Sequence, residues 1–328
     1  MNQPTRRLAL KAIAASAAAA SPWSLHAQGA WPNKAIKIVV PVAAGGIIDL
    51  VARNLADALG PKLGVPFVIE SRPGADHAIG TQAVARAEPD GYTWLCGSVP
   101  FTTTTHLRTT PPFDPFKEFK PVHNLATSPN VLVVPTTLGV NTMAEFLALG
   151  KRKSGGLTYA NPGNGSSNHL GTEQLRNATG IEMLGIPYKG QPPAITDLLT
   201  GRVDFMLMSS SLAPPHIESG KLKALASVAP VRLPKLPTVP TMKEVGFEGV
   251  NVVPWFGILM PAGTPDAVIE RAHREIRAVA ATPAYKEGLA RFGATPVAEH
   301  SISDFANALR VEFDQWPALF RQAGLTKS

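Results

Sequence analysis

The chain has 328 residues, 45% of them hydrophobic, and a formal net charge of +7. This length allows a sizeable buried core and is as compatible with two domains as with one. The basic residues occur singly or at predicted helix ends, as at 151–153, and no aromatic stacking pattern lies beside them. Composition and charge therefore disfavour nucleic-acid binding and are compatible with an acidic small ligand.

The N-terminus predicts a secretory signal peptide at residues 1–27. Adjacent arginines at 6–7 precede an apolar run at 12–20, which is too short to span a bilayer, and no acidic residue occurs before position 28. Cleavage is expected after Ala27, and the loss of three basic residues lowers the net charge to +4. The paired arginines approximate a twin-arginine signal but are common in ordinary Sec signals, so Sec export is favoured over Tat.

Residues 36–59 are predicted to form a buried strand, a turn of small residues and a helix over 47–59. The turn contains Gly45 and Gly46, which have no Cβ to block close backbone approach. The first N–H groups of the helix and its positive dipole end would face whatever lies over the glycines, an arrangement that suits a carboxylate. Neither a Walker loop nor a Rossmann fingerprint is present, so nucleotide binding is disfavoured.

Strands and helices alternate through the middle of the chain, which predicts an α/β fold. Cys96, the only cysteine, lies in an apolar run and is expected to be a buried strand residue, so no internal disulfide can form. Thr142 and Glu145 form a capping box at the start of one helix. The expected elements are strands at 66–70, 131–134, 157–160, 203–207 and 222–228 and helices at 79–87, 142–151 and 194–199.

A second anion-type loop is predicted at 161–169, where glycine, serine and asparagine lead into an amphipathic helix. Apolar stretches at 130–135 and 250–259 stand where the chain could pass between two domains.

The C-terminal part is predicted to be helical from Pro265 onward, with Thr264 as N-cap. A long last helix is expected over 303–323, with one apolar face. The side chains expected to be buried on that face are Phe305, Leu309, Phe313 and Phe320.

Six motifs follow one another along the mature chain. They are the Gly-Gly-x-x-Asp turn at 45–49, ESRPGA at 70–75, PDGYT at 89–93, YANPGNGS at 159–166, PYKG at 187–190, and WFG at 255–257 with PAGTP at 261–265. Together they resemble the Bug family, the extracytoplasmic solute-binding receptors of tripartite tricarboxylate transporters. The resemblance covers the whole mature chain.

The resemblance implies a type II periplasmic binding protein, in which two α/β lobes joined by two crossover segments close on a small carboxylic acid. Lobe 1 is expected to comprise residues 28–129 with 253–328, and lobe 2 residues 130–252. The family implies a periplasmic location, membrane transporter subunits as partners and no catalysis. We further expect a monomer that uses no cofactor or metal and binds no nucleic acid.

The resemblance places the ligand between the first Gly-Gly loop and the Gly-Ser-rich loop of the other lobe, where it is held largely by backbone N–H groups. Gly45, Gly46 and Asp49 match the first loop; Gly165, Ser166 and His169 match the second. The full set of expected ligand-binding residues is Ala44, Gly45, Gly46, Ile47, Ile48, Asp49, Ser98, Phe101, Asn164, Gly165, Ser166, Ser167, His169, Tyr188, Met208 and Ser209.

The chain departs from the family pattern at three places. A hydroxyl residue usually follows the second glycine, where this chain has Ile47 and Ile48. Gly-Gly-Asn after Arg-Pro-Gly-Ala is replaced at 76–78 by Asp-His-Ala, and an Asp-Asn pair is replaced by Met208 and Ser209. Each change removes a polar group, so we expect a bulkier or more apolar acid, such as an aromatic one. The alternative is that both isoleucines face the helix–sheet core.

Several residues have a structural interpretation beside the functional one. Asp49 would repel an anion, so a role in capping the helix or fixing the loop is preferred. His169 is expected to brace its loop, and the Asp76–His77 pair is expected to be a surface turn because no third metal ligand is spaced with it. An exported hydrolase that uses Ser166 or Ser167 as nucleophile, and a structural or adhesive protein, remain alternatives.

Overall fold

Two β-sheets organise the chain from residue 34 onward in the computed structural model, which describes residues 31–322, 324–325 and 327. In the first sheet β1 pairs in parallel with β2 and β3, whereas β10 runs antiparallel to β3 and β4. Its strand order is β11 (Thr295–Pro296), β4 (Phe119–Thr127), β10 (Trp255–Pro261), β3 (Thr93–Gly97), β1 (Ile36–Val40) and β2 (Phe67–Ser71).

The second sheet is built by the middle of the chain. In it β6 is parallel to β7 and β8, and β5 is antiparallel to β8 and β9. Its strand order is β7 (Met183–Pro187), β6 (Leu157–Asn161), β8 (Phe205–Ser209), β5 (Asn130–Pro135) and β9 (Leu222–Ser227).

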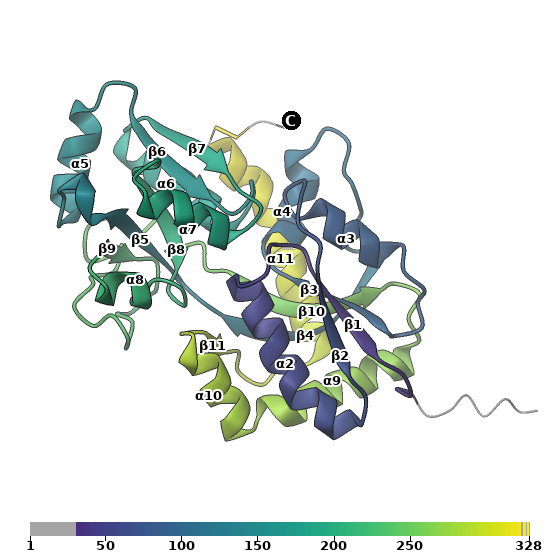
Figure 1. Ribbon diagram of the computed structural model, residues 1–328. Helices are drawn as coiled ribbons and strands as arrows, with labels where there is room; N and C mark the ends of the chain where they lie inside the picture. The colour runs from purple at the N-terminus through teal and green to yellow at the C-terminus, as the bar shows by residue number, and fades with distance from the viewer. Residues whose placement is uncertain (1–30, 323, 326, 328) are drawn as a thin grey trace, which may run out of the picture. The chain divides into compact units, whose positions relative to one another are not determined.

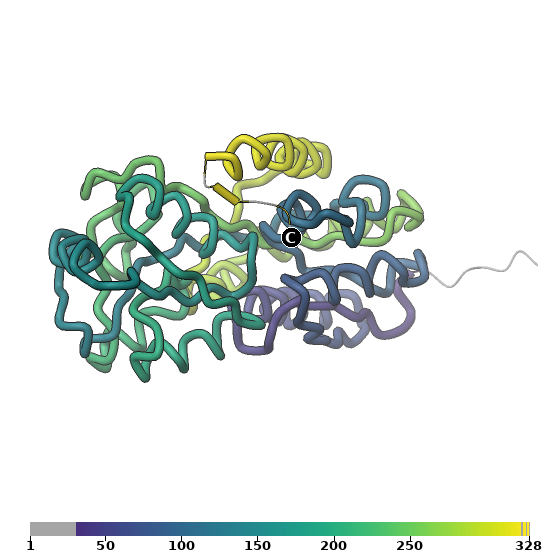
Figure 2. Tube along the Cα trace, turned by 90° about the horizontal axis from the view of Figure 1, so that it is seen from above, coloured from purple at the N-terminus to yellow at the C-terminus, as the bar shows by residue number. Residues whose placement is uncertain are grey.

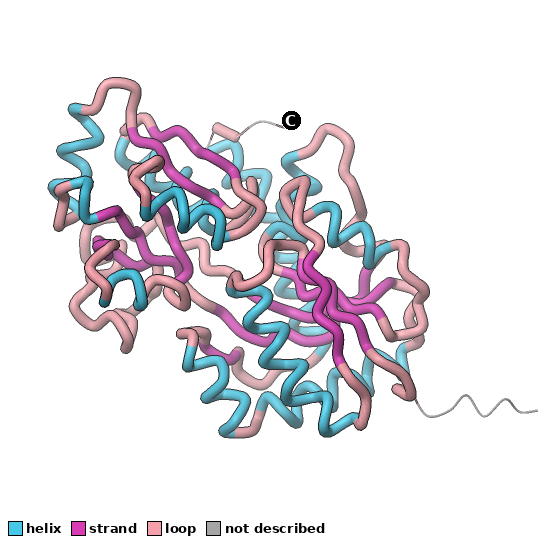
Figure 3. The backbone as a smooth tube through the Cα atoms, in the orientation of Figure 1, coloured by secondary structure: helices cyan, strands magenta, loops and turns pink. Residues whose placement is uncertain are grey.

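Helices flank both sheets, as Figure 3 shows by colour. Those that alternate with the first sheet are α2 (Ile47–Leu63), α3 (Ala78–Ala85), α4 (Pro100–Leu107), α9 (Asp266–Ala280), α10 (Pro283–Arg291) and α11 (Ile302–Gln322). Those that alternate with the second are the 3-10 turn η1 (Thr136–Leu138), α5 (Met143–Arg152), α6 (Ser167–Thr179), α7 (Gln191–Leu199) and α8 (Pro214–Glu218).

The chain passes twice between the sheets. The first passage joins β4 to β5 through residues 128–129, and the second joins β9 to β10 through residues 228–254. In Figure 1 the strands β5 to β9 therefore gather in one region, and β1 to β4 gather with β10 in another. The predicted α/β fold with two crossover segments is confirmed, whereas the lobe boundaries remain a prediction.

The second sheet is apolar on both faces because helices cover both. In β5, Leu132 and Val134 belong to a core cluster with Phe146 of α5, whereas Val131 and Val133 belong to a cluster with Leu198 of α7. Alternate residues of a strand point to opposite faces, so a strand covered on both sides must be apolar at every position. This requirement explains the uninterrupted apolar run at 131–134.

The last helix, α11, packs against β4 and α4, and Figure 2 shows its yellow trace beside the blue trace of α4. Phe305, Leu309 and Phe320 are buried as predicted, but Phe313 is only half-buried. The prediction missed Trp316, which is buried and donates a hydrogen bond from Nε1 to Thr102 Oγ1 at 3.0 Å.

Two predicted helix termini need correction. The helix expected to end at Leu59 continues through Pro61 to Leu63 and ends at Gly64, whose φ of 68° favours glycine. Thr264 is not an N-cap: α9 begins at Asp266 after Pro265, and the buried Thr264 hydroxyl has no partner among the described residues. By contrast, Thr142 caps α5 as predicted, accepting from Glu145 N at 3.1 Å.

A pair of threonine-to-valine substitutions tests this correction. Thr264→Val removes a buried, unpaired hydroxyl, so we expect it to leave the free energy of unfolding unchanged or to raise it by about 1 kcal/mol. Thr282 caps α10 by accepting from Tyr285 N at 3.3 Å, so Thr282→Val should lower it by about 1 kcal/mol. Urea denaturation measures both. Equal losses would show that the Thr264 hydroxyl does cap α9.

Candidate ligand-binding site

A pocket lies between the carboxyl ends of the parallel strands of the two sheets, close to both chain crossings. Asn130 opens β5 just after the first crossing, and Pro254 and Phe256 flank the end of the second. The lining residues are Val42, Gly46, Ile47, Ile48, His77, Ser98, Pro100, Asn130, Pro162, Ser166, Ser167, Asn168, Gly190, Gln191, Ser209, Pro254 and Phe256.

Five helices start at this pocket, namely α2, α3, α4, α6 and α7. The first N–H groups of any helix have no intrahelical acceptor and carry the positive end of the dipole. In α3, whose N-cap is His77, the N–H groups of Ala78 and Ile79 already bond the carbonyls of Ala75 and Gly74 at 3.0 and 3.4 Å. At α4 and α7 prolines at the first positions remove such donors, and in α4 the N–H of Phe101 already bonds the Ser98 carbonyl at 2.8 Å. The backbone donors offered to a ligand therefore belong mainly to α2 and α6.

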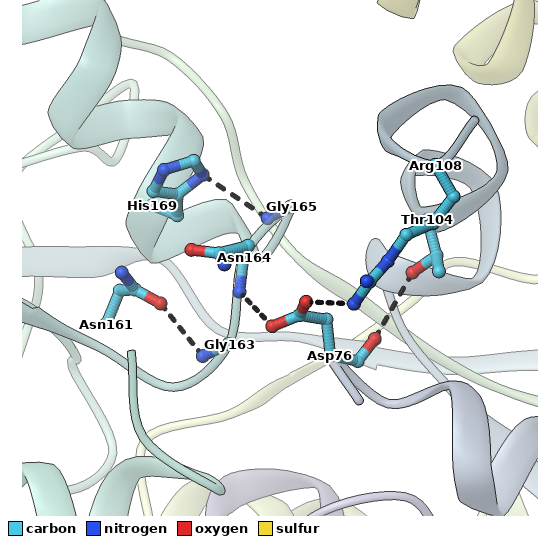
Figure 4. Close-up of polar contacts among 8 residues, drawn as sticks. All are labelled: Asp76, Thr104, Arg108, Asn161, Gly163, Asn164, Gly165 and His169. Atoms are coloured by element: carbon cyan, nitrogen blue, oxygen red, sulfur yellow. Dashed lines mark hydrogen bonds and ion pairs between the residues drawn. The ribbon is translucent and has the colours of Figure 1, made fainter. Parts of the chain in front are cut away.

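The loops before α2 and α6 are built in the same way. Gly45 and Gly165, with φ of 81° and 77°, each stand one residue before the N-cap. The third helical residue folds back on this glycine: Gly45 N donates to Asp49 Oδ2 at 3.0 Å, and Gly165 N donates to His169 Nδ1 at 3.2 Å (Figure 4 draws the second). Both loops are thus braced by a side chain from the first turn of their helix.

In α2 the N–H groups of Ile47 and Ile48 have no hydrogen-bond partner among the described residues, nor do those of Ser167 and Asn168 in α6. By contrast, Ser166 N already donates to the Gly163 carbonyl at 3.2 Å.

Asp49 is 2% exposed and also accepts from Arg53 Nε at 2.9 Å. His169 is buried, and burial lowers its pKa, so it accepts from Gly165 as a neutral ring. The structural roles preferred for Asp49 and His169 are in line with these contacts, and neither side chain lines the pocket.

The two sides of the pocket differ in polarity. The side built by the first sheet is mostly apolar, with Val42, Pro100, Pro254 and Phe256 beside both isoleucines of α2. The side built by the second sheet carries amides and hydroxyls. A ligand with a polar head and an apolar body matches this division.

The polar side is held by a network of amides and hydroxyls. Asn130 Nδ2 donates to Ser167 Oγ at 3.1 Å, and Asn168 Nδ2 donates to Asn130 Oδ1 at 3.1 Å. Gln191 Oε1 accepts from Ser209 N at 2.9 Å, which leaves the NH₂ group of Gln191 as a further donor. Ser166 caps α6 by accepting from His169 N at 3.3 Å and can still donate its own hydroxyl proton.

The lining residues include no lysine, arginine, aspartate or glutamate, and His77 is their only titratable member. Burial lowers the pKa of His77 to about 4, so the ring is neutral near pH 7. An anion in this pocket would therefore be neutralised by helix starts and hydrogen-bond donors and by no formal positive charge.

Asp76 and His77 do not form the surface turn expected from the sequence. The Asp76 carboxylate accepts from Asn164 N at 2.9 Å and from Arg108 Nη2 at 2.6 Å, and its carbonyl accepts from Thr104 Oγ1 at 3.2 Å (Figure 4). His77 is 7% exposed and lines the pocket. The loop is therefore packed against the 161–166 loop, a long-range contact that a local pattern does not reveal.

Seven of the expected ligand-binding residues line the pocket: Gly46, Ile47, Ile48, Ser98, Ser166, Ser167 and Ser209. Both isoleucines thus form part of its wall. Met208 does not line the pocket: it is 0% exposed and packs in an apolar cluster with Val131 and Val133.

The other expected residues lie around the pocket without lining it. Phe101 is buried against Phe113 and Phe119, and Tyr188 donates its hydroxyl to Asp197 at 2.8 Å. Asn164 lines a neighbouring cavity with Arg108 and His169. Ala44 and Gly45 are exposed, and Gly165 packs against Thr103.

Ten residues that line the pocket were not predicted from the sequence, although sequence motifs could have identified some of them. Gly190 and Phe256 belong to motifs that supported the family resemblance, so those motifs could have nominated them. Asn130 and Pro254 had no such signal, because only the folded chain brings both crossings to one place. The ten are Val42, His77, Pro100, Asn130, Pro162, Asn168, Gly190, Gln191, Pro254 and Phe256.

The alternative of a serine hydrolase gains no support from the described residues, in which no hydrogen bond joins a histidine ring to a serine hydroxyl. Within the same part of the chain, no group of three or more His, Cys, Asp or Glu side chains is arranged to hold a metal ion. No described helix is both long enough and apolar enough to cross a membrane. Cys96 is buried, and burial raises the pKa of its thiol to about 12, as expected for an inert strand residue.

Known proteins are similar to this chain over nearly its whole length. BugT of Bordetella pertussis (strain Tohama I) is 34% identical over 98% of both chains, and a UPF0065 protein of Pseudomonas sp. (strain P51) is 33% identical over 94% of this chain and 93% of its own. Among solved structures, the periplasmic binding protein BugD has a TM-score of 0.86 at 35% identity, covering 91% of this chain and 100% of its own.

Two further solved structures contain a carboxylic acid. An R. palustris protein with adipate has a TM-score of 0.87 at 31% identity, covering 91% of this chain and 100% of its own. MatC from Rhodopseudomonas palustris with bound malate has a TM-score of 0.83 at 28% identity, covering 88% of this chain and 99% of its own. Residues 51–325 match the family described as the tripartite tricarboxylate transporter family receptor (TctC), and the chain therefore belongs to this family of solute-binding receptors.

Proposed function

We propose that this protein captures an organic acid in the pocket between its two sheets and delivers it to membrane transporter subunits. The single observation that carries the proposal is that α2 and α6 both start at one pocket whose lining contains no lysine, arginine, aspartate or glutamate. The N–H groups at helix starts bind a carboxylate and offer little to a cation. We further propose that the mature protein works as a periplasmic monomer, after cleavage of the signal peptide near Ala27, which lies outside the described residues.

The ligand class follows from the polarity of the two sides. We propose a carboxylate head at the helix starts and an apolar ring or chain against Ile47, Ile48 and Phe256. Each charge-assisted hydrogen bond contributes about 1.5–3 kcal/mol, and the apolar body gains about 25 cal/mol for each Å² removed from water. A second carboxylate on the apolar side would find few donors and would incur a desolvation cost of several kcal/mol.

Entry and release of the ligand require the pocket to open. We propose that residues 28–129 with 253–328 and residues 130–252 act as two lobes that move about the crossings at 128–129 and 228–254. In the present structure the hydrogen bonds between these two residue ranges include those of Asp76 with Asn164 N, of Thr103 Oγ1 with the Gly165 carbonyl (2.9 Å) and of Ala43 N with the Lys189 carbonyl (2.9 Å).

Gly46→Val should abolish binding while the protein stays folded. The φ of −77° and ψ of 169° at Gly46 suit any residue, so a valine can be accommodated, but its branched side chain would occupy the space over the α2 start. Calorimetry with a bound acid should show at least about a tenfold loss, or about 1.4 kcal/mol.

Gly46→Ala is the matched control for this variant. An alanine Cβ would meet Ala43 O at 3.5 Å and Pro192 Cδ at 3.7 Å, which are ordinary contacts, so the loss should be smaller. Wild-type affinity in a folded Gly46→Val protein would remove the α2 start from the site.

Ser166→Ala should weaken binding by about 0.5–3 kcal/mol if its hydroxyl reaches the carboxylate. It also removes the α6 cap, which costs about 1 kcal/mol of stability. Thr142→Ala is the matched control, because it removes the cap of α5 far from the pocket. Both variants should lose stability in urea, and only Ser166→Ala should lose affinity. Unchanged affinity in Ser166→Ala would leave Ser166 a purely structural cap.

A competition experiment tests the ligand class. Benzoate and hexanoate should bind more tightly than malate and citrate, and Ile47→Ser with Ile48→Thr should shift the preference back toward the hydroxylated acids. Thermal-shift titration measures this order, since a ligand at 100 times its Kd adds about 2.7 kcal/mol of stability. Tighter binding of malate or citrate by the wild type would refute the apolar-body assignment.

A further inference from the structure

The loop before α3 contains three consecutive non-glycine residues in the left-handed region. Their φ values are 47° for Ala75, 52° for Asp76 and 73° for His77. Side chains are disfavoured in this conformation, which glycine adopts freely. Residues that keep a Cβ at such positions are held by surrounding contacts, and they cluster at functional sites. The contacts of each side chain show what it contributes.

Asp76 is explained by its structural contacts. Its carboxylate joins Asn164 N of the second anion-type loop to Arg108 at the end of α4. It thus fastens two loops beside the pocket, and Figure 4 shows both bonds. Ala75 is exposed and does not line the pocket.

His77 has no equivalent explanation. Its side chain is 93% removed from solvent and lines the pocket, yet Nε2 has no hydrogen-bond partner among the described residues. A buried ring nitrogen without a partner is destabilising, so a histidine with a purely structural role would be expected to pair both nitrogens. Other buried side-chain atoms of the described residues also lack a partner, but His77 is the one among them that lines the pocket, so a ligand in the pocket is the partner available to Nε2.

The position of the ring is restricted by the facing loop. A Cβ at Gly163 would lie 3.3 Å from His77 Cδ2 and 3.4 Å from Nε2, so the absence of a side chain at Gly163 makes room for this edge of the imidazole. Pro162 lines the pocket beside it. The edge of the ring that carries Nε2 therefore lies beside the backbone of Gly163 in the facing loop.

The electrostatic state of His77 restricts which group it can recognise. Burial lowers its pKa to about 4 although the Pro162 carbonyl and the Asp76 carboxylate favour the charged form. A neutral imidazole offers one donor and one acceptor and no charge. The ring donates to the Pro162 carbonyl, and because Nε2 is the nitrogen without a partner, Nε2 of the neutral ring is the acceptor. This acceptor suits a hydroxyl or an amide N–H, whereas a second carboxylate would require the ring to take up a proton to form an ion pair.

We propose that His77 selects among ligands by hydrogen bonding through Nε2 to an uncharged polar group that the acid carries away from its carboxylate. The inference rests on the proposed function and deepens it. The preferred class becomes a monocarboxylate with an apolar body and one neutral polar substituent.

The test uses acids that differ only at the far end: hexanoate, 6-hydroxyhexanoate and adipate, with benzoate and 4-hydroxybenzoate as an aromatic pair. Calorimetry on the full mature protein should show the hydroxy acid of each series binding at least about fivefold more tightly than its unsubstituted counterpart, the factor given by one neutral hydrogen bond. It should also bind more tightly than adipate.

His77→Gly removes the ring and relaxes the backbone, so the variant should fold. It should bind the hydroxy acids and their unsubstituted counterparts with about equal affinity. Asparagine tolerates a positive φ and keeps a neutral polar group. His77→Asn should therefore retain part of the preference for the hydroxy acids. Ala75→Gly is the control: it relaxes the same loop without changing a pocket wall and should leave the preference intact.

Two outcomes separate failure of the inference from failure of the proposed function. If the wild type prefers a hydroxy acid and His77→Gly keeps that preference, or if the wild type shows none, His77 does not select ligands and the proposed function stands. If the wild type binds none of these acids nor malate or citrate, the proposed function fails and the inference fails with it.

Discussion

The proposed function depends on one electrostatic constraint: a negative charge in this pocket meets backbone N–H groups at helix starts and neutral side-chain donors, and no formal positive charge. The pocket wall contains no lysine or arginine, α4 and α7 begin with prolines that remove donors, and the first N–H groups of α3 already bond carbonyls of the preceding loop. What remains is the paired starts of α2 and α6, one from each sheet. The dipoles of two helices that start at the pocket favour a carboxylate beside their first turns.

The two loops achieve this by the same local device. A left-handed glycine precedes the N-cap, and the third residue of the helix binds back to its N–H, as Asp49 does with Gly45 and His169 with Gly165. The brace fixes the loop and prevents the glycine N–H from competing for the ligand. Ile47 and Ile48 on one side and Ser167 and Asn168 on the other occupy equivalent helical positions, so the side chains there set the polarity of the site.

The sequence predicted what is encoded locally. The Gly-Gly turn, the Gly-Ser loop and the cap at Thr142 are short-range patterns, and the structure has each of them. Whether a side chain faces the pocket or the core depends on the tertiary structure, so the sequence predicted it less well. Met208 alternates into the core of its strand, and Asp76 and His77 are covered by a loop nearly ninety residues away in the chain.

The central claim is that backbone groups of α2 and α6 hold the ligand carboxylate, and a crystal structure of the protein with a bound monocarboxylic acid tests it most directly. We predict carboxylate oxygens within hydrogen-bonding distance, about 2.7–3.2 Å, of backbone nitrogens in the first turns of α2 and α6, with the apolar body against Ile47, Ile48 and Phe256. A carboxylate paired with a lysine or arginine side chain, or bound outside this pocket, would contradict the account.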